Sequence, residues 1–149
     1  MRKTIVYAVI ALVIILIGFG VVKIFDIGGY KFNKIDLTEY VNLNKSTGKH
    51  LIYVYDDSTK ENKEYTKVVK EVMAGKDTKV NALDYAKLTT NEDKEKVKSA
   101  NFYINQSLKD DNITVPMIIY IEDGKMRGGF MGTTEKANVE KFVKDNGIK

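Results

Sequence analysis

The stretch ITVPMIIYIEDGK, Ile113–Lys125, decides the fold of this chain. It holds the only proline, Pro116, directly before an apolar run that ends in Asp123-Gly124. An apolar run of this length is typical of a strand, and Asp-Gly strongly favours a tight hairpin turn. We therefore predict a strand over Val115–Glu122 and a returning strand over Lys125–Gly132.

A second apolar run, LIYVY at Leu51–Tyr55, lies toward the N-terminus and predicts a central strand. Lys60–Ala74 follows it and is the clearest helix, because its apolar residues recur at helical spacing and Gly75 ends it. These apolar residues are Tyr65, Val68, Val69, Val72 and Met73. The other expected elements are an edge strand at Tyr30–Ile35, a helix at Asp36–Asn44 stopped by Gly48, a strand at Lys79–Asp84, a helix at Asn91–Leu108, and a last helix capped by Thr133 or Thr134.

The order of these elements is β-α-β-α-β-α-β-β-α. Alternating strands and helices predict an α/β domain with a central mixed sheet flanked by helices and a hairpin at one edge. The glycines Gly128, Gly129 and Gly132 lack the spacing of a phosphate-binding loop, so we interpret them as a bulge or a close backbone approach in the last strand.

The N-terminal run Thr4–Val22 contains no charged residue and shows no polar face. A helix over this run would be about 28 Å long, close to the hydrocarbon thickness of a bilayer. Arg2 and Lys3 precede the run, and positive charge of this kind stays in the cytoplasm. We expect a single-pass cell-membrane protein whose N-terminus is cytoplasmic and whose C-terminal domain is extracytoplasmic.

A cleaved signal peptide is the alternative interpretation, since Gly18-Phe19-Gly20 is a small-x-small triplet. The apolar run exceeds the usual signal-peptide length and lacks Ala-x-Ala, which favours a retained anchor. The predicted organisation is a cytoplasmic segment 1–3, an anchor 4–22, a linker and edge segment 23–34, and the α/β domain 35–149.

The composition excludes several kinds of function. The chain has no cysteine, which rules out disulfides, thiolate nucleophiles, iron–sulfur ligation and cysteine zinc sites. The single histidine, His50, is too few for a transition-metal site, and we expect no metal and no cofactor. The net charge is only +4 and the only arginines are Arg2 and Arg127, so we expect no nucleic-acid partner.

The element order together with Ile113–Lys125 resembles the thioredoxin-like superfamily. In that family a proline opens the corresponding strand with a cis peptide bond, and Pro116 after Val115 stands in that place. The resemblance covers residues 30–146. More loosely, the chain resembles the membrane-anchored thioredoxin-like accessory proteins of Gram-positive bacteria that are associated with bacteriocin export.

The family's catalytic cysteines lie at the start of the helix after the central strand, where the helix dipole and free N–H groups stabilise a thiolate. The resemblance places Thr59 and Asn62 at those two positions, with Lys60 and Glu61 between them. A threonine there is an ordinary helix cap and cannot carry electrons. The lack of cysteine at these two positions departs from the family's pattern, and it implies a redox-inactive domain that is not an enzyme.

Two interpretations of Pro116 remain open. In the first, Thr59, Lys60, Glu61 and Asn62 form a peptide-binding groove with Val115 and Pro116. In the second, the proline only preserves the fold. Asp56-Asp57-Ser58 is expected to form a loop or a cap and not a metal site, and His50 and Ser58 are separated by a strand and cannot act as a catalytic pair.

Three functions follow as hypotheses. The first is an accessory or chaperone-like protein that binds an exported peptide or a membrane complex through this groove. The second is an enzyme that binds a thiol cofactor through the hydroxyl at the helix start, in which case glutathione would raise the melting temperature. The third is a structural or immunity-type partner of one membrane protein.

Overall fold

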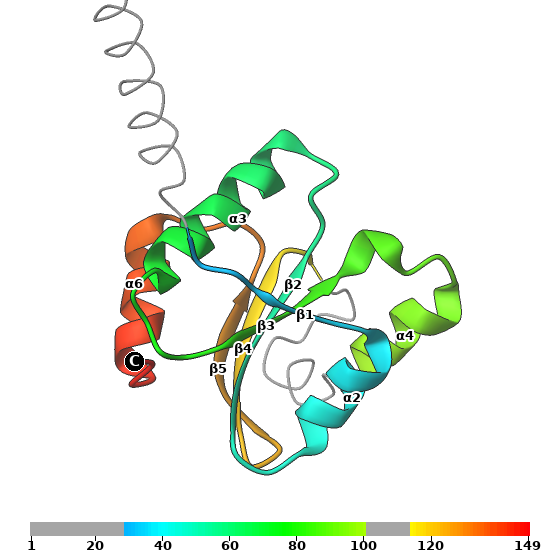
Figure 1. Ribbon diagram of the computed structural model, residues 1–149. Helices are drawn as coiled ribbons and strands as arrows, with labels where there is room; N and C mark the ends of the chain where they lie inside the picture. The colour runs from blue at the N-terminus through cyan, green and yellow to red at the C-terminus, as the bar shows by residue number, and fades with distance from the viewer. Residues whose placement is uncertain (1–28, 101–113) are drawn as a thin grey trace, which may run out of the picture.

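The computed structural model describes residues 29–100 and 114–149, which form a five-stranded mixed sheet with helices on both faces (Figure 1). The strand order is β1-β3-β2-β4-β5. β1, β3 and β2 are parallel, whereas β4 and β5 are antiparallel to their neighbours. The strand bounds are β1 Asn33–Ile35, β2 Lys49–Tyr55, β3 Val80–Asp84, β4 Met117–Glu122 and β5 Lys125–Met131.

The helices divide between the two faces of the sheet. α2 packs with α4 on one face, and α3 packs with α6 on the other (Figure 1). The bounds are α2 Leu37–Lys45, α3 Lys60–Met73, a short 3-10 helix η1 Tyr85–Lys87, α4 Asn91–Ala100 and α6 Lys136–Asp145. The predicted α/β class and the flanked mixed sheet are therefore confirmed. Residues 101–108 of the predicted helix Asn91–Leu108 lie outside the described residues.

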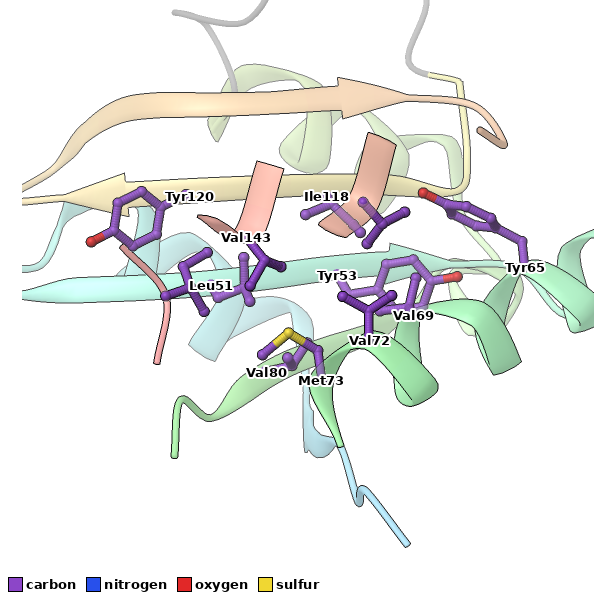
Figure 2. Packing of buried hydrophobic residues seen from close by; sticks show 12 residues of the cluster. Leu51, Tyr53, Tyr65, Val69, Val72, Met73, Val80, Ile118, Tyr120 and Val143 are labelled. Atoms are coloured by element: carbon purple, nitrogen blue, oxygen red, sulfur yellow. The ribbon is translucent and has the colours of Figure 1, made fainter. Parts of the chain in front are cut away.

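β2 lies at the centre of the sheet and supplies side chains to both layers of the core. Leu51 and Tyr53 join the cluster beneath α3 and α6, whereas Ile52 and Val54 join the cluster beneath α2 and α4. Figure 2 shows the first cluster, in which Tyr53 lies among side chains from α3 and β4. Burial on both faces explains why this strand is continuously apolar.

Asp36 is the N-cap of α2, since its carboxylate accepts a hydrogen bond from the Glu39 N–H at 2.8 Å. Gly48 is not the stop that the sequence predicted. The helix ends at Lys45, and the Ser46 N–H and hydroxyl both donate to the Leu43 carbonyl. The Ser46 side chain satisfies a terminal carbonyl, so the helix closes before it reaches the glycine.

The predicted Asp123-Gly124 turn joins β4 to β5, and both residues have positive φ, as a type I′ hairpin turn requires. Asp123 also fastens this hairpin to the loop before β2. Its carboxylate accepts from the Gly48 N–H at 2.8 Å, and its own N–H donates to the Gly48 carbonyl at 2.9 Å.

The predicted irregularity of the last strand is confirmed. The β4–β5 register shifts between Tyr120 and Ile121, which leaves Arg127 as the extra residue of a bulge. A Cβ on Gly129 would lie 2.6 Å from the Ile118 carbonyl oxygen. Only glycine therefore lets β5 approach β4 this closely.

The predicted cap of the last helix is wrong. α6 begins at Lys136, and the residue at its cap position, Glu135, makes no side-chain capping bond. Both threonine hydroxyls are used elsewhere: Thr133 donates to Glu61, and Thr134 accepts from the Asn138 side chain. Because each hydroxyl is hydrogen-bonded to another side chain, neither threonine caps α6.

The sequence also predicts a membrane anchor at residues 4–22, which lies outside the described residues together with residues 1–3 and the first part of the 23–34 segment. Within residues 29–100 and 114–149, no helix is long and apolar enough to span a bilayer.

Candidate functional site

The first segment of the predicted site lies at the N-terminus of α3. Thr59 is the N-cap, and its hydroxyl accepts a hydrogen bond from the Asn62 N–H at 3.1 Å. The Thr59 carbonyl also accepts from the Lys63 N–H. Thr59, Lys60 and Glu61 are exposed and Asn62 is half-buried. The first turn of a helix presents N–H groups without helical partners, so this surface favours a carbonyl or a carboxylate.

The second segment lies just before β4. The Val115–Pro116 peptide bond is cis, as the resemblance implies, and Pro116 is buried while Val115 is half-buried. The Pro116 carbonyl accepts a hydrogen bond from the Gly132 N–H at 2.7 Å. The backbone N–H and carbonyl of Val115 make no hydrogen bond to any residue in 29–100 or 114–149.

Neighbouring strands hold the two segments at the same end of the sheet. The end of β2 leads into the N-terminus of α3, and Val54 near that end pairs with Met117 at the start of β4. A side-chain hydrogen bond links the first segment to the residues after β5, because the Thr133 hydroxyl donates to the Glu61 carboxylate at 2.9 Å. Thr133 directly follows Gly132, which holds Pro116. The structure thus places both predicted segments at the same end of the neighbouring strands β2 and β4.

A hydrogen-bond chain that sequence reasoning missed lies under the start of α3. The Thr66 hydroxyl donates to the Asp57 carboxylate at 2.7 Å, and the Tyr53 hydroxyl lies 3.0 Å from the Thr66 oxygen. A threonine hydroxyl has one proton, so Tyr53 donates to Thr66. The signal in the sequence was a threonine on the apolar face of the helix, between Tyr65 and Val69.

Burial raises the pKa of Tyr53, and the Asp57 carboxylate adds to this effect, although the Thr66 hydrogen bond opposes it. Tyr53 therefore stays protonated and remains a donor at neutral pH. Tyr65 lies beside it at a ring-centroid separation of 6.4 Å, and burial raises its pKa as well. The Tyr65 hydroxyl is the one buried side-chain polar atom without a partner among the residues that the structure describes.

The acidic loop before α3 is used in local structure. Asp56 accepts from the Ser58 N–H at 2.9 Å, an Asx turn that prepares the helix start, and Asp57 accepts from Thr66. Across the described ranges, no group of three or more His, Asp or Glu side chains could hold a metal ion. His50 lies at the other end of β2, where its Nε2 contacts the Ser46 hydroxyl and the Thr47 carbonyl, far from Ser58.

No protein-family model matches the sequence, and no curated protein is significantly similar to it. Among solved structures, the chain is similar to thioredoxin from Aeropyrum pernix, with a TM-score of 0.51, 12% identity and coverage of 75% of this chain and 84% of that one. Mitochondrial thioredoxin 3 of Saccharomyces cerevisiae in its oxidized form gives 0.48, 20% identity and coverage of 76% and 94%. A structure from work on the yeast mitochondrial 1-Cys peroxiredoxin and its glutathione/thioredoxin systems gives 0.49, 20% identity and coverage of 77% and 95%.

Proposed function

We propose that this thioredoxin-fold chain is a membrane-anchored, extracytoplasmic binding protein that performs no thiol–disulfide chemistry and is not an enzyme. It binds an extended peptide segment across Thr59–Asn62 and Val115–Pro116. The peptide belongs to an exported polypeptide or to a membrane complex that this chain assists. The anchor is the apolar run at residues 4–22, with the N-terminus in the cytoplasm.

The observation that carries the proposal is that hydrogen bonds connect the start of α3, through Thr133 and Gly132, to Pro116, although the chain has no cysteine. Glu61 on α3 is bonded to Thr133, and the neighbouring Gly132 N–H holds the Pro116 carbonyl. A cap residue alone needs neither contact. The arrangement therefore supports a surface that is kept for contacts with another molecule.

The backbone at this site suits an extended peptide. The Val115 N–H and carbonyl are unpaired within the described residues, so a peptide strand can form main-chain hydrogen bonds there. The N–H groups in the first turn of α3 that have no helical partner can donate hydrogen bonds to a peptide carbonyl on the other side of the site. Main-chain bonding of this kind supplies affinity without demanding one sequence.

The membrane part of the proposal rests on the sequence. A charge-free run from Thr4 to Val22 has the length and polarity of a spanning helix, and Arg2 and Lys3 set its orientation.

Site-specific photo-crosslinking tests the peptide site. A photoreactive amino acid replaces Lys60 in the full-length protein in its own membranes, because Lys60 is exposed and its replacement leaves the Thr59 cap intact. The matched control carries the same group at Lys144, which is exposed on α6. We expect one dominant adduct from position 60 that is missing from position 144. Equal, weak labelling at both positions would contradict the proposal.

A further inference from the structure

Lysines gather on the surface where the described chain begins. We call this surface the entry face, and its lysines are Lys31, Lys70, Lys76, Lys79 and Lys149. Lys70 is half-buried and the other four are exposed. None of the five forms an ion pair with a residue in 29–100 or 114–149.

Contacts between segments that are distant in the sequence hold the entry face together. The Lys70 ammonium nitrogen, in the last turn of α3, lies 5.3 Å from the centroid of the Phe32 ring, and that ring lies 6.0 Å from the Tyr30 ring. The Tyr30 hydroxyl donates to the Thr78 carbonyl. The Thr78 N–H and hydroxyl both donate to the main-chain oxygen of Lys149 at 2.7 Å. Figure 1 shows the start of the described chain next to α3.

The carboxylates beside these lysines do not balance their charge. Asp77 is the acidic residue in the loop before β3 and is exposed. Glu71, on α3, is paired with Lys136 at 3.1 Å. The entry face therefore keeps a net positive charge spread over several side chains, which suits an extended anionic surface better than one small anion.

The sequence places the entry face close to the proposed anchor. The charge-free run ends at Val22, and Tyr30 follows eight residues later. Eight residues span at most about 28 Å, and the headgroup layer of a bilayer is about 5–8 Å thick. A folded domain of this size is about 35 Å across. Because the connection is shorter than the domain, the entry face is held within reach of the headgroups.

We propose that the entry face binds the headgroups of anionic lipids in the membrane that holds the anchor. The inference rests on the anchor of the proposed function, at residues 4–22. Each lysine beside an anionic surface strengthens binding about fivefold. This attraction acts only within about 10 Å, so the short connection favours it.

Lipid binding at the entry face directs the peptide site away from the membrane. Val80 begins β3, and its N–H donates to the Tyr30 hydroxyl at 2.8 Å. Thr59 instead follows the carboxyl end of β2, which is parallel to β3. The entry face and the peptide site therefore lie at opposite ends of these two strands.

Quenching of a fluorophore by headgroup-labelled lipid tests the proposal. The chain has no cysteine, so Ala74→Cys gives a single labelling site beside the entry face, and Ser58→Cys gives the control beyond the other end of β2. Both positions are exposed. Each labelled full-length protein is placed in nanodiscs whose lipids carry a nitroxide on the headgroup, with phosphatidylglycerol or with phosphatidylcholine alone. We expect quenching at position 74 to be at least twofold stronger in the anionic discs and to fall at about 1 M salt, with little quenching at position 58.

Two pairs of substitutions supply the matched comparison. Lys76→Gln with Lys79→Gln removes two charges from the entry face and is expected to weaken its lipid binding about 25-fold, which abolishes the lipid-dependent quenching. Lys63→Gln with Lys125→Gln removes the same charge from two exposed lysines elsewhere and is expected to leave the quenching unchanged. Equal effects of the two pairs would overturn the proposal.

The same discs separate this inference from the anchor. A chain that does not remain with the discs would overturn the anchor and this inference together. A chain that remains, with quenching at position 74 no stronger than at position 58 or equal in both lipids, would overturn this inference alone. The crosslinking at Lys60 tests the peptide site independently.

Discussion

Thr66 shows how one residue can link the core to the proposed peptide site. Its hydroxyl accepts from buried Tyr53 and donates to Asp57 in the loop that leads into α3. The chain of bonds orients that loop from below. Because Tyr53 is completely buried, its hydroxyl has no access to water if Thr66 is lost.

Thr66→Val keeps the shape of the side chain and removes both hydrogen bonds. We expect the free energy of unfolding to fall by about 1–3 kcal/mol, the cost of a buried hydroxyl without a partner. Urea denaturation measures the change. Thr38→Val, at an exposed position on α2, is the control and should change the stability little. A Thr66→Val protein as stable as the parent would show that the chain of bonds contributes nothing.

Gly129 is the second residue whose role depends on its surroundings. A Cβ there would lie 2.6 Å from the Ile118 carbonyl oxygen and 3.0 Å from two side-chain atoms. Gly129→Ala should therefore lower the free energy of unfolding by about 1–3 kcal/mol, because β5 must move away from β4. Thermal unfolding measures this. Gly29→Ala, where a Cβ meets no atom within 4 Å, should be close to neutral, and an equal effect at both positions would contradict the argument.

At the scale of elements, the start of α3 is the part that carries the proposed site. Thr59→Ala removes the hydrogen bond to the Asn62 N–H and should lower the free energy of unfolding by about 1 kcal/mol. Ser58→Ala is the matched control, since within residues 29–100 and 114–149 the hydrogen bond of Ser58 comes from its backbone N–H and not from its hydroxyl. Chemical denaturation of the two variants checks the difference. Identical midpoints would mean that Thr59 is not a working cap.

The helices and strands differ in how closely their bounds could be predicted from the sequence. The strand over Leu51–Tyr55 begins two residues earlier, at Lys49, because Lys49 pairs in register with Glu122 and their side chains lie 3.4 Å apart. That extension depends on a strand distant in the sequence. The predicted helix Lys60–Ala74 differs by one residue, since α3 ends at Met73 and Ala74 is its extended C-cap. The prediction is this close because the apolar spacing and the N-cap are local features of the sequence. The cap of α6 was missed because Thr133 bonds to Glu61 on another element.

At the scale of the whole molecule, the anchor that we propose at residues 4–22 is the feature to test, because it would set where the domain works. The full-length protein should remain in the membrane fraction after alkaline extraction, and an external protease should reach the C-terminal domain in intact cells. Deletion of residues 1–22 should release a soluble, folded monomer, because the core of the domain lies within residues 29–149. Circular dichroism and size-exclusion chromatography measure the fragment. Aggregation would contradict a self-sufficient domain, and extraction of the full chain would contradict the anchor.

The predicted thioredoxin-like fold is confirmed by the strand order and by the similarity to the Aeropyrum pernix thioredoxin. The residues of the proposed peptide site were named from the sequence, and their role in binding stays a prediction. The hydrogen bond between Glu61 and Thr133 could not be predicted, because it joins residues far apart along the chain.

The sequence by itself determined the order of the elements, the Asp-Gly turn, the capped start of α3 and the absence of cysteine, because each depends on neighbouring residues or on composition. Only the tertiary structure decided which hydroxyls cap and which bridge, and how closely β5 approaches β4. The physical reason is that these features are contacts between elements. Their energies depend on packing and hydrogen bonding across the fold, which no local pattern in the chain records.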